Sequence, residues 1–171
     1  MRLTAALGLL RRNPMAEDIQ LHPDLQALID DHWDFVLRLH HSNSLAPLAA
    51  TMDLAGEING AALVLDQEKF DADKSTPDDA ISILTGQFIA AAQRGEIKAS
   101  AILFHGNNDR RSAPLPAEDV AAANCIVVFL DHRDGQAVAA IINYLQDSGG
   151  TWRYAAPVYH LKKPLIFGEK K

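Results

Sequence analysis

Hydrophobic residues recur at helical spacing in the first part of the chain, between His22-Pro23 and about His41. Intervals of three and four residues place them on one face, so the pattern predicts an amphipathic helix with one buried stripe. Pro23 suits the first helical position, where its missing N–H costs no hydrogen bond. The predicted stripe consists of Leu25, Leu28, Ile29, His32, Phe35, Val36 and Leu39.

A second helix is predicted from its boundary residues. Thr76 is a suitable cap, Pro77 a suitable first residue, and Gly95 a suitable terminator, while acidic residues in the first turn favour the positive end of the helix dipole. Its predicted core positions are Ile81, Leu84, Phe88 and Ala91.

The remaining apolar runs are short and are bounded by turn residues, which is typical of strands. They are Pro47–Leu54, Ile58–Leu65, Ile97–His105, Cys125–His132, Gln136–Tyr144 and Thr151–His160. The first two predict a hairpin, although the alanine-rich first run also fits a helical turn, and the last four predict a meander. We therefore expect an α+β fold, in which a hairpin and a C-terminal meander form an antiparallel sheet packed with two long helices.

A two-residue turn at Asp134-Gly135 predicts the register of the last three strands. The resulting pairs are Arg133 with Gln136, Asp131 with Val138, Phe129 with Ala140, Cys125 with Tyr144, Tyr144 with Trp152 and Gln136 with His160. Both faces of this sheet are then apolar, so a layer must cover each face. The two helices either share one face, which leaves the other as an oligomer interface, or divide between the faces. Pro157 predicts that the last strand lies at an edge.

Composition indicates one globular domain, because 48% of the 171 residues are hydrophobic and 22% are charged. We assign residues 15–171 to a single domain and residues 1–14 to a basic leader. Three interpretations of the leader stay open: an upstream extension before a start at Met15, a frayed terminal helix, or a targeting or docking peptide.

Charge and cysteine content narrow the possible partners. The net charge is −6 and the leader holds three arginines without an acid, so the remainder carries −9. This charge disfavours nucleic acid as a partner. No apolar run approaches the length that spans a bilayer, so we expect no membrane partner. Cys125 is the single cysteine, which makes a reducing cytoplasm the simplest location.

The best candidate site is one end of the predicted sheet, which we call the rim: Asp131, His132, Arg133, Asp134 and His160, with Glu96 nearby. A solvated hairpin tip has the same composition. The functional alternative is an anion or carboxylate contact by Arg133 with help from His132 or His160. The rim does not announce the three or four ligands that zinc normally takes, and we predict no catalytic residue, metal or cofactor.

Structural roles are predicted for the other histidines. His40 and His41 lie in the last helical turn, where they are expected to interact with the terminal carbonyls. His32 belongs to the apolar stripe and is expected to be a core histidine. His105 and His132 lie about eight residues apart along the sheet, roughly 26 Å at ~3.3 Å per residue, so they cannot share a metal.

No catalytic or binding motif of known mechanism is present, so the functional hypotheses rest on the apolar faces of the predicted sheet and on the rim. The leading hypothesis is a non-enzymatic cytoplasmic domain that acts by association, as a homodimer or as a protein-interaction module. The alternatives are a small-molecule binder or weak hydrolase that uses His132, Arg133 and His160, and a partner-bound regulatory domain that uses the connection 106–124. The order helix, two strands, helix and further strands is similar to that of profilin-like and roadblock-type regulatory domains, without an accompanying motif.

Overall fold

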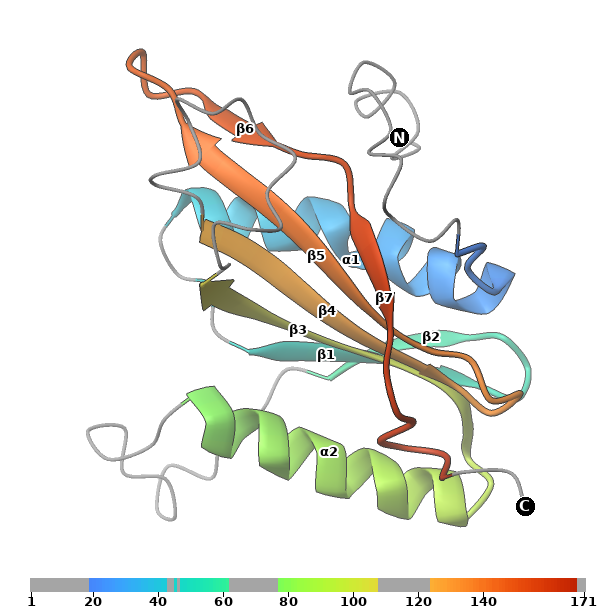
Figure 1. Cartoon of the computed structure of the whole chain (residues 1–171). Coiled ribbons are helices and arrows are strands. Elements are labelled where there is room, and N and C mark those ends of the chain that lie inside the picture. The colour runs from blue at the N-terminus through green and yellow to red at the C-terminus, as the bar shows by residue number, and fades with distance from the viewer. Residues whose placement is uncertain (1–18, 43–44, 46, 62–76, 108–123, 169–171) are drawn as a thin grey trace, which may run out of the picture.

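The computed structural model describes residues 19–42, 45, 47–61, 77–107 and 124–168. It contains an antiparallel sheet of seven strands between two helices, which confirms the predicted α+β fold (Figure 1). The helices are α1 (Pro23–His41) and α2 (Pro77–Gln93). The strands are β1 (Leu48–Asp53), β2 (Ile58–Ala61), β3 (Ile97–Asn107), β4 (Asn124–His132), β5 (Ala137–Gln146), β6 (Trp152–Tyr154) and β7 (Val158–Leu161). Neither described helix is both long and apolar enough to cross a membrane.

The sheet has the strand order β2-β1-β3-β4-β5-β6, and β7 also pairs with β5. The predicted hairpin and meander are therefore both present, joined by pairing of β1 with β3. The single predicted strand Thr151–His160 is wrong: it is two strands, because the segment containing Pro157 leaves the ladder between them. Both pieces lie at the outer edge of β5, which confirms the edge position expected from Pro157.

The register between β4 and β5 differs from the predicted register by one residue. His132 pairs with Gln136 through its amide, and Gly135 has a positive φ of 104°, so the loop has three residues, Arg133, Asp134 and Gly135. Asp131 therefore lies opposite Ala137, and Leu130 lies opposite Val138. Since side chains alternate between faces, this shift exchanges the faces assigned to β5 relative to β4.

The later pairings also differ from prediction. Tyr144 lies opposite Tyr154, a shift of two residues that keeps Trp152 on the same face. His160 lies opposite Ala139 instead of Gln136, because the interruption at Ala155-Ala156-Pro157 changes the register of β7.

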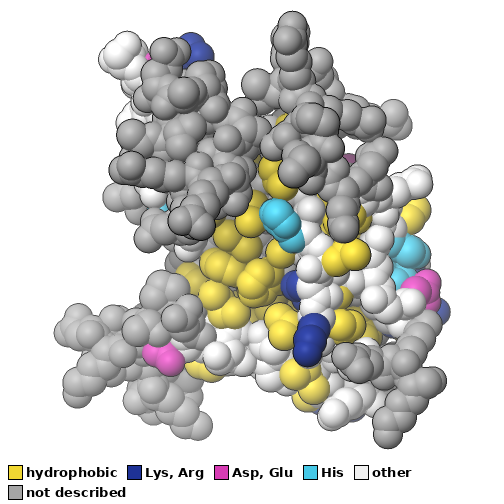
Figure 2. All heavy atoms as spheres, in the orientation of Figure 1, with side chains coloured by type: hydrophobic (Ala, Val, Ile, Leu, Met, Phe, Trp, Pro, Cys, Tyr) yellow, Lys and Arg dark blue, Asp and Glu magenta, His cyan; other side chains and the backbone are white. Residues whose placement is uncertain are grey.

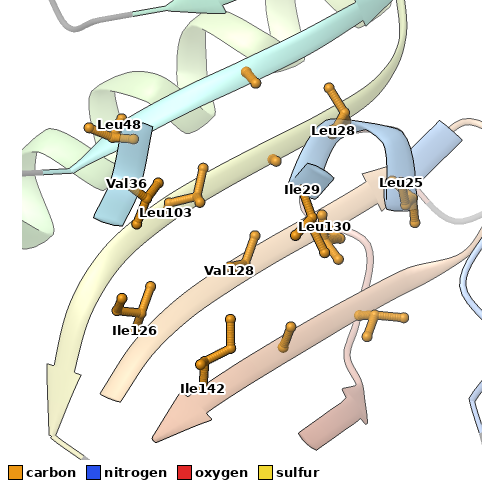
Figure 3. Packing of buried hydrophobic residues seen from close by; sticks show 14 of the residues in the cluster. Leu25, Leu28, Ile29, Val36, Leu48, Leu103, Ile126, Val128, Leu130 and Ile142 are labelled. Carbon is orange, nitrogen blue, oxygen red and sulfur yellow. The ribbon is translucent and has the colours of Figure 1, made fainter. Parts of the chain in front are cut away.

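The two helices divide between the two faces of the sheet, which decides between the alternatives left open by the sequence (Figure 1). Helix α1 packs against β1, β3 and β4, and its buried residues Leu25, Leu28, Ile29 and Val36 meet Leu103, Ile126, Val128, Leu130 and Ile142 (Figure 3). Burial of each such side chain stabilises the folded state by about 2 kcal/mol. This interface forms the larger core.

The core of the other face is smaller. Helix α2 packs against β3, and its buried Leu84 and Phe88 meet Ile97, Ile102 and Ile166. Gly95 ends this helix with a positive φ of 71°, as predicted. Thr76 and residues 62–65 of the predicted hairpin lie outside the described residues, as does the leader.

One predicted stripe residue of α1 is wrong. The ring of Phe35 is 45% exposed, and the Arg38 guanidinium lies 5.7 Å from its centre. Trp33 packs against the core instead. Helical periodicity alone does not decide whether a residue at the edge of an apolar stripe faces the core or the solvent.

A buried carboxylate anchors the residues that follow β7. Asp131 is 2% exposed on the α2 side of the sheet. Its Oδ2 accepts a hydrogen bond from Lys162 Nζ at 2.5 Å, and its Oδ1 accepts one from the Leu165 amide at 2.7 Å. Ile166 is thereby held against α2.

Substitution of Asp131 by Asn should lower the free energy of unfolding by about 2–3 kcal/mol, because it leaves the mostly buried Lys162 charge without its partner. Urea unfolding at pH 7.5 measures this change. Glu96→Gln is the matched control, since the Arg94–Glu96 pair is exposed and its loss should be undetectable. Equal effects of the two substitutions would contradict the role given to Asp131.

Candidate functional site

The structure does not bring the predicted rim residues together. The side chains of Asp131 and His132 point to opposite faces of the sheet, as neighbours in a strand must. His160 is exposed opposite Ala139, on the same face as Asp131. Of the six predicted residues, only His132 and Asp134 belong to the cluster of ionisable groups described below.

Two further members of the predicted rim lie on the surface. Arg133 is exposed in the β4–β5 turn, and its amide donates to the Lys98 carbonyl at 2.9 Å. Glu96 accepts two hydrogen bonds from Arg94, at 2.7 and 2.9 Å, which lower the pKa of this carboxyl group. Ligand binding by the rim stays a prediction without geometric support.

The cluster that does form consists of His22, Asp24, His132, Asp134 and Lys98, and we call it the histidine clasp. It joins the N-terminal end of α1 to the β4–β5 turn. The imidazoles of His22 and His132 are stacked, with their centres 3.7 Å apart and 22° between their planes. His132 is buried, with 2% of its side chain exposed.

The two histidines make the same set of contacts. Each begins a His-x-Asp sequence, His22-Pro23-Asp24 or His132-Arg133-Asp134. The Nδ1 of each ring accepts the amide hydrogen of its own Asp at 3.1 Å. The Nε2 of each ring faces the carboxylate of the other sequence, at 3.1 Å for His132 and Asp24 and at 3.6 Å for His22 and Asp134.

These contacts assign the tautomers. A ring nitrogen that accepts an amide hydrogen must present its lone pair, so the single proton of each neutral imidazole lies on Nε2. From there the proton points toward a carboxylate. When both rings are neutral, each Nδ1 therefore accepts an amide hydrogen and each Nε2–H faces a carboxylate.

A β-bulge supplies the cation of the cluster. Met52 pairs with Ala99 and Asp53 with Ile97, which leaves Lys98 without an opposite residue. Its Nζ lies 3.1 Å from Asp24 Oδ2. Burial acts against ionisation of Asp24, but hydrogen bonds from His132 and Lys98 outweigh it and lower the pKa of this carboxyl group.

The pKa of His132 is lowered from its ordinary value. Burial is the largest cause and the charge of His22 adds to it, while Asp24 and Asp134 act in the opposite direction without outweighing burial. His132 is consequently neutral at pH 7, in agreement with its hydrogen bonds.

The clasp also contains the atoms of a possible metal site. Ligand atoms of His22, Asp24 and His132 all lie within 4.8 Å of one another. Stacked rings, however, direct their in-plane lone pairs along nearly parallel lines, whereas two imidazoles on one zinc must converge on it. The Nδ1 lone pairs are also occupied by amide hydrogens. In this arrangement the cluster is a hydrogen-bonded clasp and does not fit a metal.

A second group of imidazoles lies at the opposite end of α1. His40 is 6% exposed, and its Nδ1 is 2.7 Å from the Tyr154 hydroxyl. Its ring meets Tyr144 and Trp152 edge to face, with centres 4.1 and 4.5 Å apart. The prediction that His40 interacts with the helix carbonyls is therefore wrong, because β5 and β6 bring an aromatic wall to that position.

Burial sets the protonation states in this group. It lowers the pKa of His40, with help from His105 and His41, and it raises the pKa of Tyr154 to about 12. His105 makes a hydrogen bond with Tyr144. The hydroxyl groups of Tyr144 and Tyr154 thus stay protonated at neutral pH, and the group packs the C-terminal end of α1 without offering an activated nucleophile.

Sequence reasoning missed His22 and Asp24 as partners of His132, and Lys98 as the cation that pairs with Asp24. Asp24 lies 108 positions from His132 and Lys98 lies 34 positions from it, so no local spacing connects them. The repeated His-x-Asp sequence was the one available signal. It is short enough to occur by chance, and only the packing of α1 gives it meaning.

Comparisons with protein-family models, with curated proteins and with solved structures found no match to this chain. The similarity of element order to profilin-like and roadblock-type domains gains no support from them. Function must therefore be argued from the geometry alone.

The lowered pKa values of His132 and His40 predict a stability that depends on pH. The unfolded chain binds these protons at about pH 6.5, whereas the folded protein resists them, so stability is complete above about pH 6.5 and declines below it. Urea unfolding at intervals between pH 7.5 and 5.0 should show this decline. His132→Asn should reduce the slope, and His160→Asn should leave it unchanged. A flat profile would contradict the proposed neutral state.

Proposed function

We propose that the protein is a non-enzymatic cytoplasmic domain that acts by association, with a second copy of the same chain as its partner. One observation carries the proposal: a set of partly buried apolar side chains on the α2 side of the sheet, which extends from the end of β3 across β4, β5 and β7. We call this set the open apolar patch. Its members are Phe104, Val127, Phe129, Ala139, Ile141 and Val158.

The patch follows from a difference in extent between the sheet and the described segments that cover it. Helix α2 packs on β3, and the segment after β7 covers Asp131, but β4 and β5 extend beyond these two described segments. Phe104 and Phe129 touch the smaller core at the margin, with ring centres 5.0 Å apart. Figure 2 shows hydrophobic side chains gathered on this face. Contiguous apolar surface of this kind usually marks a contact surface.

Charge favours a second copy that meets the first through this patch. The chain has a net charge of −6, so two copies repel one another at most orientations. The open apolar patch consists of uncharged side chains. In an isologous contact the same patch faces itself, and an uncharged centre avoids like charges across the symmetry axis.

The geometry gives less support to the alternatives. A small-molecule site or hydrolase built on His132, Arg133 and His160 would need side chains that converge, and these diverge. Cys125 is 2% exposed, and burial raises the pKa of its thiol, which makes it a poor nucleophile. A regulatory domain that uses the connection 106–124 is a further candidate, but residues 108–123 lie outside the described residues.

Light scattering coupled to size-exclusion chromatography tests the proposal. The protein should elute as a dimer at tens of micromolar, and Ile141→Lys should raise the dissociation constant at least ~100-fold, because the interface would then bury an unpaired charge on each side. Leu54→Lys is the matched control: Leu54 is 54% exposed in the β1–β2 turn, and its replacement should leave the dimer intact.

A monomeric wild-type protein at that concentration would overturn the homodimer. Dimerisation that survives Ile141→Lys and Val127→Lys would instead show that the copies meet elsewhere. Thermal unfolding of each variant establishes that the substitutions at these partly buried positions leave the fold intact.

A further inference from the structure

The histidine clasp holds a segment that has few other attachments. Before α1, the described chain begins with residues 19–22, and Gln136 binds this segment twice. Its Oε1 accepts the His22 amide at 2.6 Å, and its Nε2 donates to the Gln20 carbonyl at 2.9 Å. The β4–β5 turn therefore grips the N-terminal end of α1 through two side chains, His132 and Gln136.

The hydrogen bonds of the stacked His22–His132 pair require neutral rings. A protonated imidazole carries hydrogen on both nitrogens, so its Nδ1 would meet the amide hydrogen that it accepts in this structure. Either ring loses its backbone hydrogen bond when it is protonated. Two protonated rings with centres 3.7 Å apart would also place like charges in contact.

We propose that the histidine clasp is a proton-sensitive latch, in which protonation of the imidazoles separates His22 from His132 and releases residues 19–24 from the β4–β5 turn. The released segment carries Ile19 and Leu21, which pack at the margin of the larger core. Leu25 and Leu28 are fully buried one turn further on, so the remainder of α1 stays on the sheet. The device is local to one end of the helix.

The charged groups around the rings define the pH range. Among the residues that the structure describes, those that face the pair are Asp24 on α1, Asp134 in the turn and Lys98 on β3. The carboxylates favour a single protonated ring, but with both rings charged three cations face two anions. Because the pKa of Asp24 is itself lowered, this carboxylate stays ionised at the pH at which an imidazole takes up a proton. The latch therefore responds to protonation of an imidazole and not of Asp24.

Nuclear magnetic resonance of the full chain tests the latch at single residues. At pH 7.5 the imidazole nitrogen signals should show the Nε2–H tautomer for both His22 and His132. Between pH 7.5 and 5.0 the amide signals of Asp24 and Asp134 should shift together with the titration of the rings. Amide-exchange protection of Asp24 should fall at least about tenfold after correction for intrinsic rates.

The double variant His22→Asn/His132→Asn isolates the rings. Asparagine retains an acceptor for the nearby amide at each position but does not titrate. In this variant the amide signals of Asp24 and Asp134 should no longer depend on pH. The signals around His40, about 27 Å away along α1, should respond as in the wild type. His160→Asn is the control for a histidine outside the clasp and should behave as the wild type.

Two results would overturn the latch. One is an Nδ1–H tautomer for either ring at pH 7.5, a measurement on the wild type that does not depend on the folding of any variant. The other is an unchanged environment of Asp24 and Asp134 down to pH 5.0. Neither result bears on the dimer, because the clasp and the open apolar patch lie on opposite faces of the sheet.

Discussion

The central strands carry apolar side chains on both faces, and most of the structure is a response to that constraint. Ile126, Val128 and Leu130 of β4 point toward α1, while Val127 and Phe129 point toward the α2 side. Burial of one such aliphatic side chain is worth about 2 kcal/mol, whereas a hydrogen bond contributes about 1 kcal/mol net. A strand of this kind is stable only between two layers, and in this structure the helices divide between the faces. Among the described residues, α2 and the segment after β7 cover only part of the α2 side, and the proposed association rests on this difference.

The polar groups of the protein are arranged by the register of one turn. Strand alternation places Asp131 and His132 on opposite faces, and the three-residue loop from Arg133 to Gly135, with Gly135 at positive φ, sets Ala137 opposite Asp131. Asp131 then anchors Lys162 and the segment after β7, while His132 meets α1. Two neighbouring residues that look like one site in the sequence thus serve two separate layers. The bulge at Lys98 has a similar effect, because it directs a cation to Asp24 and lets Ile97 reach the α2 side.

Imidazoles hold both ends of α1 to the sheet. His22 and His132 join its beginning to the β4–β5 turn, and His40 joins its end to Tyr154 and the aromatic side chains of β5 and β6. A neutral imidazole can be buried at modest cost when its nitrogens find partners, which a lysine or a glutamate cannot do without a counter-charge. The same property makes these contacts sensitive to acid. The aliphatic residues between them, which do not titrate, keep the helix in place.

The sequence by itself determined the elements, and it did so through local chemistry. Proline and glycine set the ends of α1 and α2, apolar runs set the strands, and Pro157 set the edge. The absence of polar alternation in β4 and β5 showed that two covering layers were needed. Tertiary structure alone decided the rest. Whether an Asp-Gly turn closes with two or three residues depends on which pairing buries Val138 with Leu130, and that is a property of the packed sheet. Apart from Asp134, the members of the histidine clasp lie 34 and more positions from His132, so their meeting depends on the docking of α1 and on one bulge, which no local pattern encodes.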